Sequence, residues 1–262
     1  MVDAMPVSAG RDVVRLAEIS RATGVDIVAT TGLHHDRYYG PLHWTNRVGA
    51  DELADLFVAD LLDGVDEFDY TSPVVRRTGH RAGLVKVATS GEHPDARDRR
   101  NIDPVAQASR RTGAPVLTHC EGGYGGIAQV ESLVSAGVPA TSVILSHVDK
   151  PENLSYLRDL AETGVVLELD QSLRQFERET ESITIRAIGA LADAGFEDQI
   201  IVGTDGARRS LWTSLGGSPG LAWLGSTLPG VMARAGTSSE VANKVMRTNA
   251  ERALRWRAPE ES

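Results

Sequence analysis

Four residues of this 262-residue sequence carry side chains that suit metal-assisted chemistry, and each lies in or directly after an apolar segment. Lys86 lies within GLVKVATSG, whereas His119, His147 and Asp205 follow the runs PVLT, VILS and IIVGT. Two histidines and a carboxylate form a common ligand set for zinc or a similar divalent ion. One such histidine alone is equally well explained as a hydrogen-bonded core residue, but four such positions on successive segments predict a metal site.

Lys86 needs an explanation of its own, because an ammonium group repels a metal ion. Burial disfavours the charged form of a lysine and so lowers its pKa. The neutral amine can then add carbon dioxide. The resulting carbamate is an anion that can bridge two metal ions, so a lysine is compatible with this site.

The elements that must position these residues follow one repeated pattern. Five segments consist of a helical pattern, a glycine that marks the helix end, a short apolar run and a polar residue. The runs lack polar alternation, which is typical of strands buried on both faces of a parallel sheet. A sixth run begins at Gly83 without the preceding helix and glycine. The five glycines are Gly24, Gly113, Gly137, Gly164 and Gly195.

The segment before Gly24 predicts an amphipathic helix. Its expected apolar face consists of Val13, Leu16, Ala17 and Ile19. No linker or low-complexity segment interrupts the repeated pattern. We therefore predict a single domain of repeated strand and helix units over residues 1–262.

Two architectures accept this pattern, an open doubly wound sheet and a closed (β/α)8 barrel. The open sheet usually carries a GxGxxG turn after its first strand, and GGYGG at 122–126 has neither that spacing nor that position. The predicted site residues lie within their strands or at the carboxyl ends, where barrels build their active sites. The pattern therefore favours an α/β fold of the (β/α)8 TIM-barrel type.

Composition narrows the choice of partners. Lys and Arg total 27 against 36 for Asp and Glu, a formal net charge of -9, which disfavours binding to nucleic acid or to an anionic membrane surface. The single cysteine, Cys120, excludes an intrachain disulfide and fits a reducing compartment. No apolar stretch approaches the roughly 20 residues that span a bilayer. We expect a cytoplasmic protein that acts on a small molecule.

The motifs around the four residues together resemble the phosphotriesterase family of the amidohydrolase superfamily. The similarity covers GRDVVRLAEISRATGVDIVATTG near the start, the four segments quoted above, GGSPGL and TNAERAL. In that family a carboxylated lysine bridges two metal ions, usually zinc, while two histidines bind one ion and an aspartate binds the other. The resemblance implies these roles for Lys86, His119, His147 and Asp205.

The sequence departs from the family at its beginning. The first strand of the family ends in a His-x-His pair, and no such pair is present. Val2–Ala4 matches the end of the second strand, so we expect an N-terminally incomplete barrel that lacks strand 1 and most of strand 2. Loss of a strand would expose two backbone edges. We interpret the beginning as a misplaced start codon rather than as a natural seven-stranded enzyme.

The resemblance implies hydrolysis of a phosphotriester, a lactone or a related ester by hydroxide that the metal ions activate. Asp205 is the expected proton acceptor. For this chain we expect at most one well-held ion, at Lys86, His119 and His147, and weak activity. The family suggests a homodimer. The alternative is a degenerate, non-catalytic barrel that binds a small molecule or a partner.

Loops after the predicted strands contain further candidates. His34, Tyr38 and Tyr39 could line a substrate pocket, and tyrosines in such loops also cover core edges. Arg208 could bind an anionic group, or it could be a solvated surface residue. The EGGYGG segment at 121–126 offers backbone donors for a phosphate but lacks the lysine and hydroxyl of a P-loop, so we interpret it as a flexible turn.

Overall fold

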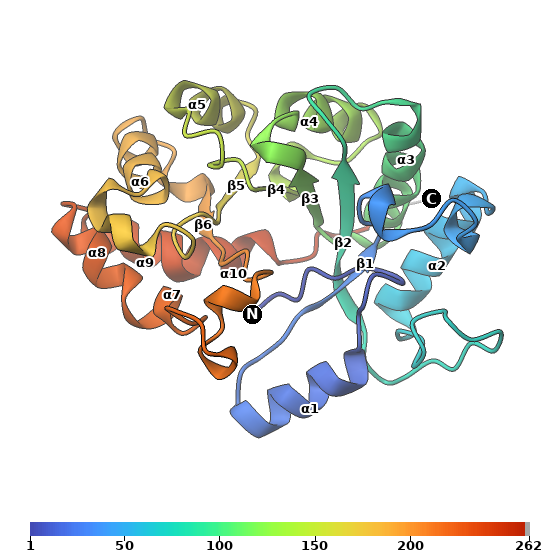
Figure 1. Ribbon diagram of the computed structural model, residues 1–262. Helices are drawn as coiled ribbons and strands as arrows, with labels where there is room; N and C mark the ends of the chain where they lie inside the picture. Colours follow the sequence, from blue (N-terminus) through green and yellow to red (C-terminus); the bar gives the residue numbers. More distant parts are fainter. Residues whose placement is uncertain (260–262) are drawn as a thin grey trace. The chain divides into compact units, whose positions relative to one another are not determined.

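Parallel strands alternate with helices along residues 1–259, which are the residues that the computed structural model describes (Figure 1). The strands belong to one sheet, and their order in it follows the chain. The α/β class and a strand in each of the six predicted segments are thereby confirmed. The strands are β1 (Ala29–Gly32), β2 (Ala82–Thr89), β3 (Val116–Cys120), β4 (Val143–Ser146), β5 (Val166–Leu169) and β6 (Ile200–Val202).

The helices begin and end where local signals predict. Asp12 caps the first helix by accepting a hydrogen bond from the backbone N–H of Arg15, and Gly24 ends it in the left-handed conformation. All five glycines predicted to end helices have positive φ angles, from 70° at Gly24 to 90° at Gly137. None of the helices within residues 1–259 combines the length and hydropathy required to span a lipid bilayer. The α-helices are α1 (Val13–Thr23), α2 (Ala50–Leu62), α3 (Ala96–Thr112), α4 (Gly126–Ser135), α5 (Leu154–Glu162), α6 (Ile183–Asp193), α7 (Trp223–Ser226), α8 (Leu228–Arg234), α9 (Ser239–Asn243) and α10 (Asn249–Ala253).

The chain divides into two compact units. Unit 1 consists of residues 1–119, residues 128–143 and the chain from Leu254 onward. Unit 2 consists of residues 120–127 and residues 144–253. β1 and β2 therefore belong to unit 1, whereas β5 and β6 belong to unit 2. The single-domain organisation stays a prediction.

In unit 1, α2 and α3 pack against each other and against β2 (Figure 1). Phe57 of α2 and Leu84 of β2 are fully buried, as the apolar periodicity of both segments requires. β1 pairs with β2 so that Gly32 lies opposite Lys86. A Cβ atom at Gly32 would lie 2.1 Å from the carbonyl oxygen of Lys86, so only glycine permits this pairing.

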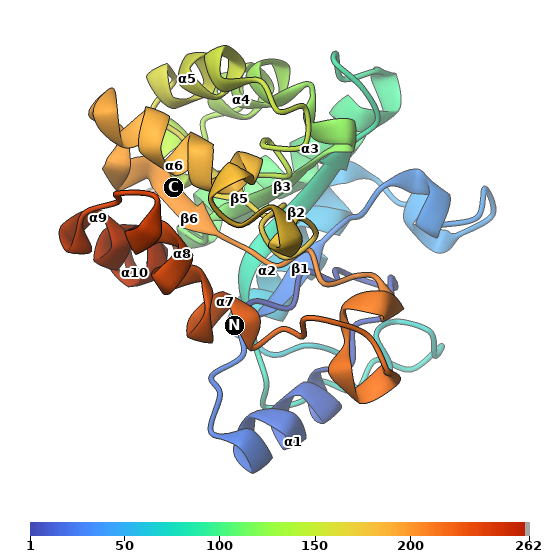
Figure 2. The same cartoon turned by 60° about the vertical axis from the view of Figure 1, so that its left-hand side comes forward.

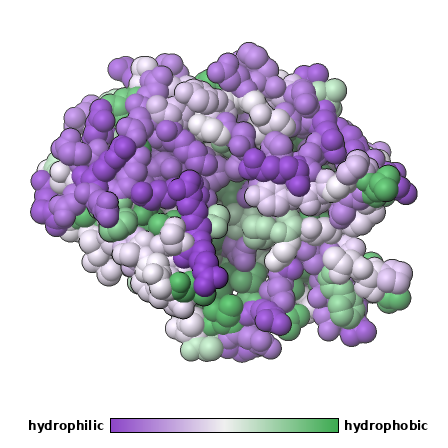
Figure 3. Space-filling model, in the orientation of Figure 1, coloured by the Kyte–Doolittle hydropathy of each residue, from purple (hydrophilic) through white to green (hydrophobic). Residues whose placement is uncertain are grey.

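The helix α1 is less buried than its pattern predicts. Val13 is 4% exposed, but Ile19 is 49% exposed, and Leu16 and Ala17 are half-buried. Hydrophobic surface is visible at the lower edge of Figure 3, in the region where α1 lies in Figure 1. The predicted apolar face is therefore wrong in part. Periodicity identifies residues that share a face of a helix, but not whether another element covers that face.

In unit 2, α5 and α6 lie side by side, and α5 packs against β5 (Figure 2). Leu157 of α5, Leu167 of β5 and Ile188 of α6 are fully buried. β4 pairs with β5 in a register that places Ser146 opposite Glu168. This core fixes the ends of β4 and β5, where the candidate ligands of unit 2 follow.

The first residues of the chain pair with the segment before β1. Val2 forms an isolated parallel bridge with Val28. The backbone N–H of Asp3 donates to the carbonyl oxygen of Val28 at 2.9 Å. Within the described residues, the strand end predicted at Val2–Ala4 is thus a single bridge.

Candidate functional site

Unit 1 brings together three of the predicted site residues, His34, Lys86 and His119, which we term the unit 1 cluster. Lys86 lies in β2 and is 5% exposed, and its Nζ donates to the carbonyl oxygen of Ala4 at 2.9 Å. His119 lies in β3 and is buried. The ring centroids of His34 and His119 are 5.3 Å apart. Lys86 and His119 thus lie within regular strands, whereas His34 lies just after the end of β1.

The electrostatics of the unit 1 cluster favour a neutral imidazole at His34. Burial, followed by the positive charge of Lys86, lowers the pKa of His34 from 6.5 to about 2. A neutral imidazole has a nitrogen lone pair that can accept a hydrogen bond or bind a metal ion.

Unit 2 brings together His147, Asp170 and Asp205, which we term the unit 2 cluster. One ligand atom from each residue can be chosen so that all three lie within 4.8 Å of one another. His147 Nδ1 lies 2.5 Å from Asp170 Oδ2 and 3.6 Å from Asp205 Oδ2. One imidazole and two carboxylates are a suitable donor set for a divalent ion such as zinc. The unit 2 cluster therefore fits a metal ion.

Two residues of the unit 2 cluster have an unusual backbone. His147 follows β4 with a φ of 69°, and Asp205 follows β6 with a φ of 35°. Residues other than glycine rarely adopt positive φ, and such strain costs on the order of 1–3 kcal/mol. The bends turn these side chains out of the strand direction and require surrounding contacts to hold them.

Two cations surround Asp205. Arg174 Nη2 lies 2.6 Å from Asp205 Oδ2 and also donates to the carbonyl oxygen of Asp205 at 3.1 Å. Lys150 Nζ lies 3.6 Å from the same carboxylate. The carboxylate of Asp205 is therefore paired with two cations.

The buried carboxylate of Asp149 holds the backbone next to the unit 2 cluster. Asp149 is fully buried and accepts hydrogen bonds from the backbone N–H groups of Asp170 and Gln171, and from Thr184 Oγ1 at 2.6 Å. Burial, followed by the charge of Asp170, raises the pKa of Asp149. Burial opposes ionisation of Asp170 as well, but the hydrogen bond with His147 keeps the pKa of Asp170 below its usual value.

The residues predicted for substrate contact lie in different surroundings. Tyr38 is 48% exposed, and its ring centroid lies 4.1 Å from that of His34. Tyr39 is buried, and its hydroxyl accepts from the backbone N–H of His34 and donates to the carbonyl oxygen of Val7. Arg208 is exposed in the segment after β6. Tyr39 thus braces the backbone at His34, and contact of any of these residues with substrate stays a prediction.

The largest difference from the sequence-based set is Asp170, which we did not single out. It directly follows the apolar run VVLEL, in the same position after a strand as His147. The pattern of an apolar run and a polar residue therefore contained the signal. Of the four predicted ligands, the structure brings Lys86 together with His119 in unit 1 and places His147 and Asp205 in unit 2.

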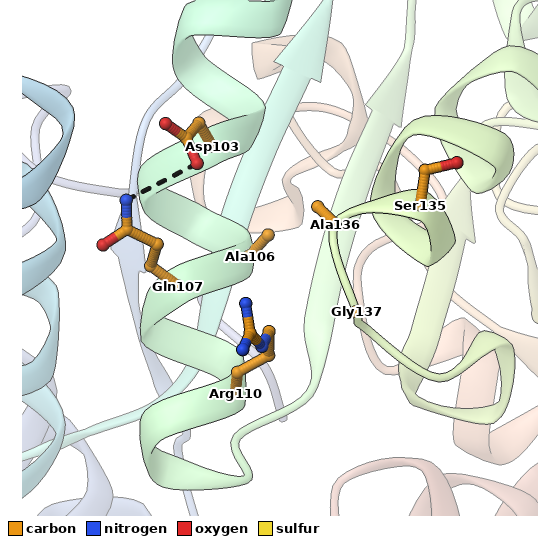
Figure 4. Close-up of a pocket in the computed structure, with 7 residues that line it drawn as sticks. All are labelled: Asp103, Ala106, Gln107, Arg110, Ser135, Ala136 and Gly137. Carbon is orange, nitrogen blue, oxygen red and sulfur yellow. Dashed lines mark hydrogen bonds between the residues drawn. The ribbon is translucent and has the colours of Figure 1, made fainter. Parts of the chain in front are cut away.

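A surface cavity of about 370 Å³ lies between α3 and the end of α4 in unit 1 (Figure 4). Gln107 Nε2 donates to Asp103 Oδ1 at 3.5 Å on one side of it, and Arg110 approaches Gly137 on the other. None of the residues that line it is a predicted site residue. The cavity therefore shares no lining residue with either cluster.

Parallel strands that alternate with helices, with histidines and carboxylates at or after the carboxyl ends of the strands, are typical of enzymes with a (β/α)8 barrel. The model of the phosphotriesterase family matches residues 1–254, so the chain belongs to that family. This confirms the resemblance predicted from the motifs.

Two relatives show how the chain compares with known hydrolases. A phospho-furanose lactonase of Mycoplasmopsis synoviae is 28% identical over 259 residues, which cover 95% of this chain and 73% of the relative. An aryldialkylphosphatase of Saccharolobus solfataricus is 26% identical over 207 residues, which cover 78% of this chain and 62% of the relative. Other matches cover only 48% of the relative, so the chain spans about half to three quarters of the length of its relatives.

Solved structures confirm the barrel class. An amidohydrolase from Mycoplasma synoviae superposes with a TM-score of 0.89 at 25% identity, over 99% of this chain and 75% of that structure. A lactonase from Listeria monocytogenes superposes with a TM-score of 0.86 at 26% identity, over 98% of this chain and 81% of that structure. The expected α/β fold of the metal-dependent hydrolase barrel type is therefore correct.

Proposed function

We propose that this protein is a metal-dependent hydrolase that opens a lactone or a related ester. The observation that carries the proposal is the unit 2 cluster, in which His147, Asp170 and Asp205 can direct ligand atoms at one ion. Zinc suits this set of nitrogen and oxygen donors. In the unit 1 cluster we assign ligand roles to His119 and to a carbamate on Lys86.

A bound divalent ion would lower the pKa of water toward neutrality and polarise the ester carbonyl. The residues of the chain then have distinct tasks. Asp205 accepts the proton that the attacking water releases, because its carboxylate lies beside the other ligands. Arg174 holds both the carboxylate and the carbonyl oxygen of Asp205, which keeps the acceptor in place.

We further propose that the ester carries an anionic group such as a phosphate. Lys150 and Arg174 both lie beside Asp205, and a cationic pair of this kind suits a phosphate better than an uncharged phosphotriester. The relatives named as phospho-furanose lactonases support the same substrate class. The non-catalytic alternative is not favoured, since the named relatives are hydrolases.

The test is hydrolysis of a phosphorylated five-membered sugar lactone and of the same lactone without phosphate, each with the zinc-loaded full chain. We expect the phosphorylated lactone to be opened, and Asp205→Asn to lower kcat/KM by about 1000-fold or more. Asparagine tolerates the positive φ at this position, so the fold should persist. Failure of the zinc-loaded chain to open either lactone would contradict the proposal.

Substrate charge is tested with a pair of lysine variants. Lys150→Met should raise KM for the phosphorylated lactone by about 10- to 100-fold, because a charge-assisted contact is lost, and leave the other lactone unchanged. Lys244→Met is the matched control, since Lys244 pairs with Glu197 at 3.1 Å in the same unit.

We also propose that the protein is cytoplasmic and forms a homodimer.

A further inference from the structure

The segment Glu121–Gly126 follows β3 and contains two neighbouring glycines with different surroundings. Gly122 and Gly123 both have positive φ angles, 67° and 87°. Gly123 is buried, whereas Gly122 is exposed. The segment is therefore not uniformly solvent-exposed, and Gly123 is the position at which it packs against the chain that follows β4.

Gly123 is in close contact with the backbone of His147. A Cβ atom built on Gly123 would lie 2.6 Å from the carbonyl oxygen of His147 and 2.5 Å from Cδ of Pro151. At Gly122 the nearest atom would be Cδ2 of Tyr124, at 3.7 Å, which is an ordinary contact. A side chain is thus sterically excluded at Gly123 but not at Gly122.

The segment cannot easily move away to make room for a side chain at Gly123. The backbone N–H of Gly126 donates to the hydroxyl of Tyr156 at 2.9 Å, which ties the end of the segment to α5. A Cβ atom at Gly126 would also lie 2.8 Å from Leu160. An added methyl group at Gly123 would therefore displace the carbonyl of His147 or the ring of Pro151.

The conformation of His147 depends on contacts with neighbouring groups because its backbone has a positive φ angle. It has a φ of 69°, a conformation that persists only where neighbouring groups fix it. Lys150 N–H donates to the His147 carbonyl at 3.1 Å, and Asp170 binds both the backbone N–H and the Nδ1 of His147. Gly123 approaches His147 on the carbonyl side, where a Cβ atom would lie 2.6 Å from the carbonyl oxygen.

We propose that Gly123 is a positioning residue for His147: its missing side chain lets the Glu121–Gly126 segment seat against the His147 carbonyl and thereby orients the imidazole. The inference rests on the proposed function, in which His147 is a metal ligand. Groups that orient a ligand affect metal affinity by about 10- to 100-fold when they are changed. In this inference the Glu121–Gly126 segment positions a metal ligand.

The test compares Gly123→Ala with Gly122→Ala in the full chain. Both changes put alanine at a positive φ, so both should lower the thermal midpoint. Only Gly123→Ala should weaken Co²⁺ binding, by about 10-fold or more, as followed by the visible absorption of the bound ion. Equal Co²⁺ affinities of the two variants would overturn the inference.

A third variant separates the two atoms that Gly123 approaches. In Gly123→Ala combined with Pro151→Ala, the contact with the proline ring is removed and the contact with the His147 carbonyl stays. We expect the Co²⁺ affinity to stay low. Recovery of wild-type affinity would overturn the inference, because Gly123 would then act through Pro151.

A measurement on the metal-free chain keeps the inference distinct from the proposed function. The imidazole proton between His147 Nδ1 and Asp170 Oδ2, 2.5 Å apart, should give a downfield proton resonance that His147→Ala removes. Gly123→Ala should shift or broaden this resonance and Gly122→Ala should not; the same spectrum for both variants would overturn the inference. Absence of Co²⁺ binding by the wild-type chain would instead contradict the proposed function.

Discussion

The two clusters of candidate ligands are built in different ways. In the unit 1 cluster, Lys86 and His119 lie within β2 and β3, so their positions follow from the hydrogen bonds of the sheet. In the unit 2 cluster, all three residues come after a strand, and His147 and Asp205 have positive φ angles. The first cluster is formed by regular backbone and the second by bends that local contacts must hold.

The clusters also differ in charge. The unit 1 cluster contains no carboxylate of its own, since its members are two imidazoles and an amine. The unit 2 cluster has two carboxylates with Arg174 and Lys150 beside Asp205. The side chains within strands thus form a cluster without carboxylates, whereas the carboxylates lie just after the ends of strands.

The largest expected effect comes from replacing one histidine in each cluster. His119→Asn and His147→Asn should each weaken zinc affinity by at least about 100-fold, because each removes a ligand. His147→Asn should in addition destabilise the metal-free chain by about 1–3 kcal/mol, since the buried carboxylate of Asp170 loses its partner. Zinc competition with a chelating dye and urea unfolding measure the two effects.

Exposed His93 provides the matched control for these variants. His93→Asn should retain both the zinc affinity and the stability of the wild type. If His119→Asn or His147→Asn also retained wild-type zinc affinity, the corresponding cluster would not hold the ion. The pair of variants thus tests each cluster on its own.

A smaller effect should distinguish Lys86 from an ordinary cation. A guanidinium does not form a carbamate, so Lys86→Arg should lose about 10-fold in zinc affinity, within the range for groups around a metal site. Added bicarbonate should raise the zinc content of the wild-type chain but not that of Lys86→Arg. Lys244→Arg, at a lysine paired with Glu197, should respond to bicarbonate like the wild type. An identical response in Lys86→Arg would exclude the carbamate.

The smallest expected effect is on the pH dependence of stability, and it comes from ion pairs of Arg11 in unit 1 that lie outside the unit 1 cluster. Arg11 binds the buried carboxylates of Asp60 and Asp69 at 2.9 and 2.7 Å, so two acids share one guanidinium. Burial raises the pKa of Asp69 from 3.8 to about 6. Between these values the folded state holds more protons than the unfolded state, so its stability falls as pH rises.

The slope should be at most about 1.4 kcal/mol per pH unit between pH 4 and pH 6, and it should level off above pH 6. Asp69→Asn should lack this contribution, and asparagine is tolerated at the φ of 48° found there. Urea unfolding of both proteins at pH 4.5 and pH 6.5 measures the difference. Parallel pH dependences in the two proteins would show that Asp69 is not protonated in the folded state.

The fold could be predicted closely because its signals are local. Glycines at helix ends and apolar runs without regular polar alternation predicted all six strands of the described residues. The burial of a helix face was harder to predict, as the exposed Ile19 shows, because it depends on elements distant in sequence. The positive φ of His147 could not be predicted either, because the residue at that position is not a glycine.

The candidate site could be predicted at the residues that interrupt apolar runs. Lys86 and His119 were found because a charged or polar side chain within a buried strand is rare. Asp170 was missed although it follows a strand, because an aspartate just after a strand is also an ordinary turn residue. The support of Asp170 by Asp149 and Thr184 joins three segments, so only the folded chain reveals it.

The most direct test of the central claim is the zinc content of the full chain after equilibrium dialysis of the metal-free protein, followed by lactone hydrolysis of the same sample. We predict tightly bound zinc in the folded chain, with hydrolysis that rises in proportion to the zinc bound. A chain that folds but retains no zinc would contradict a metal-dependent function.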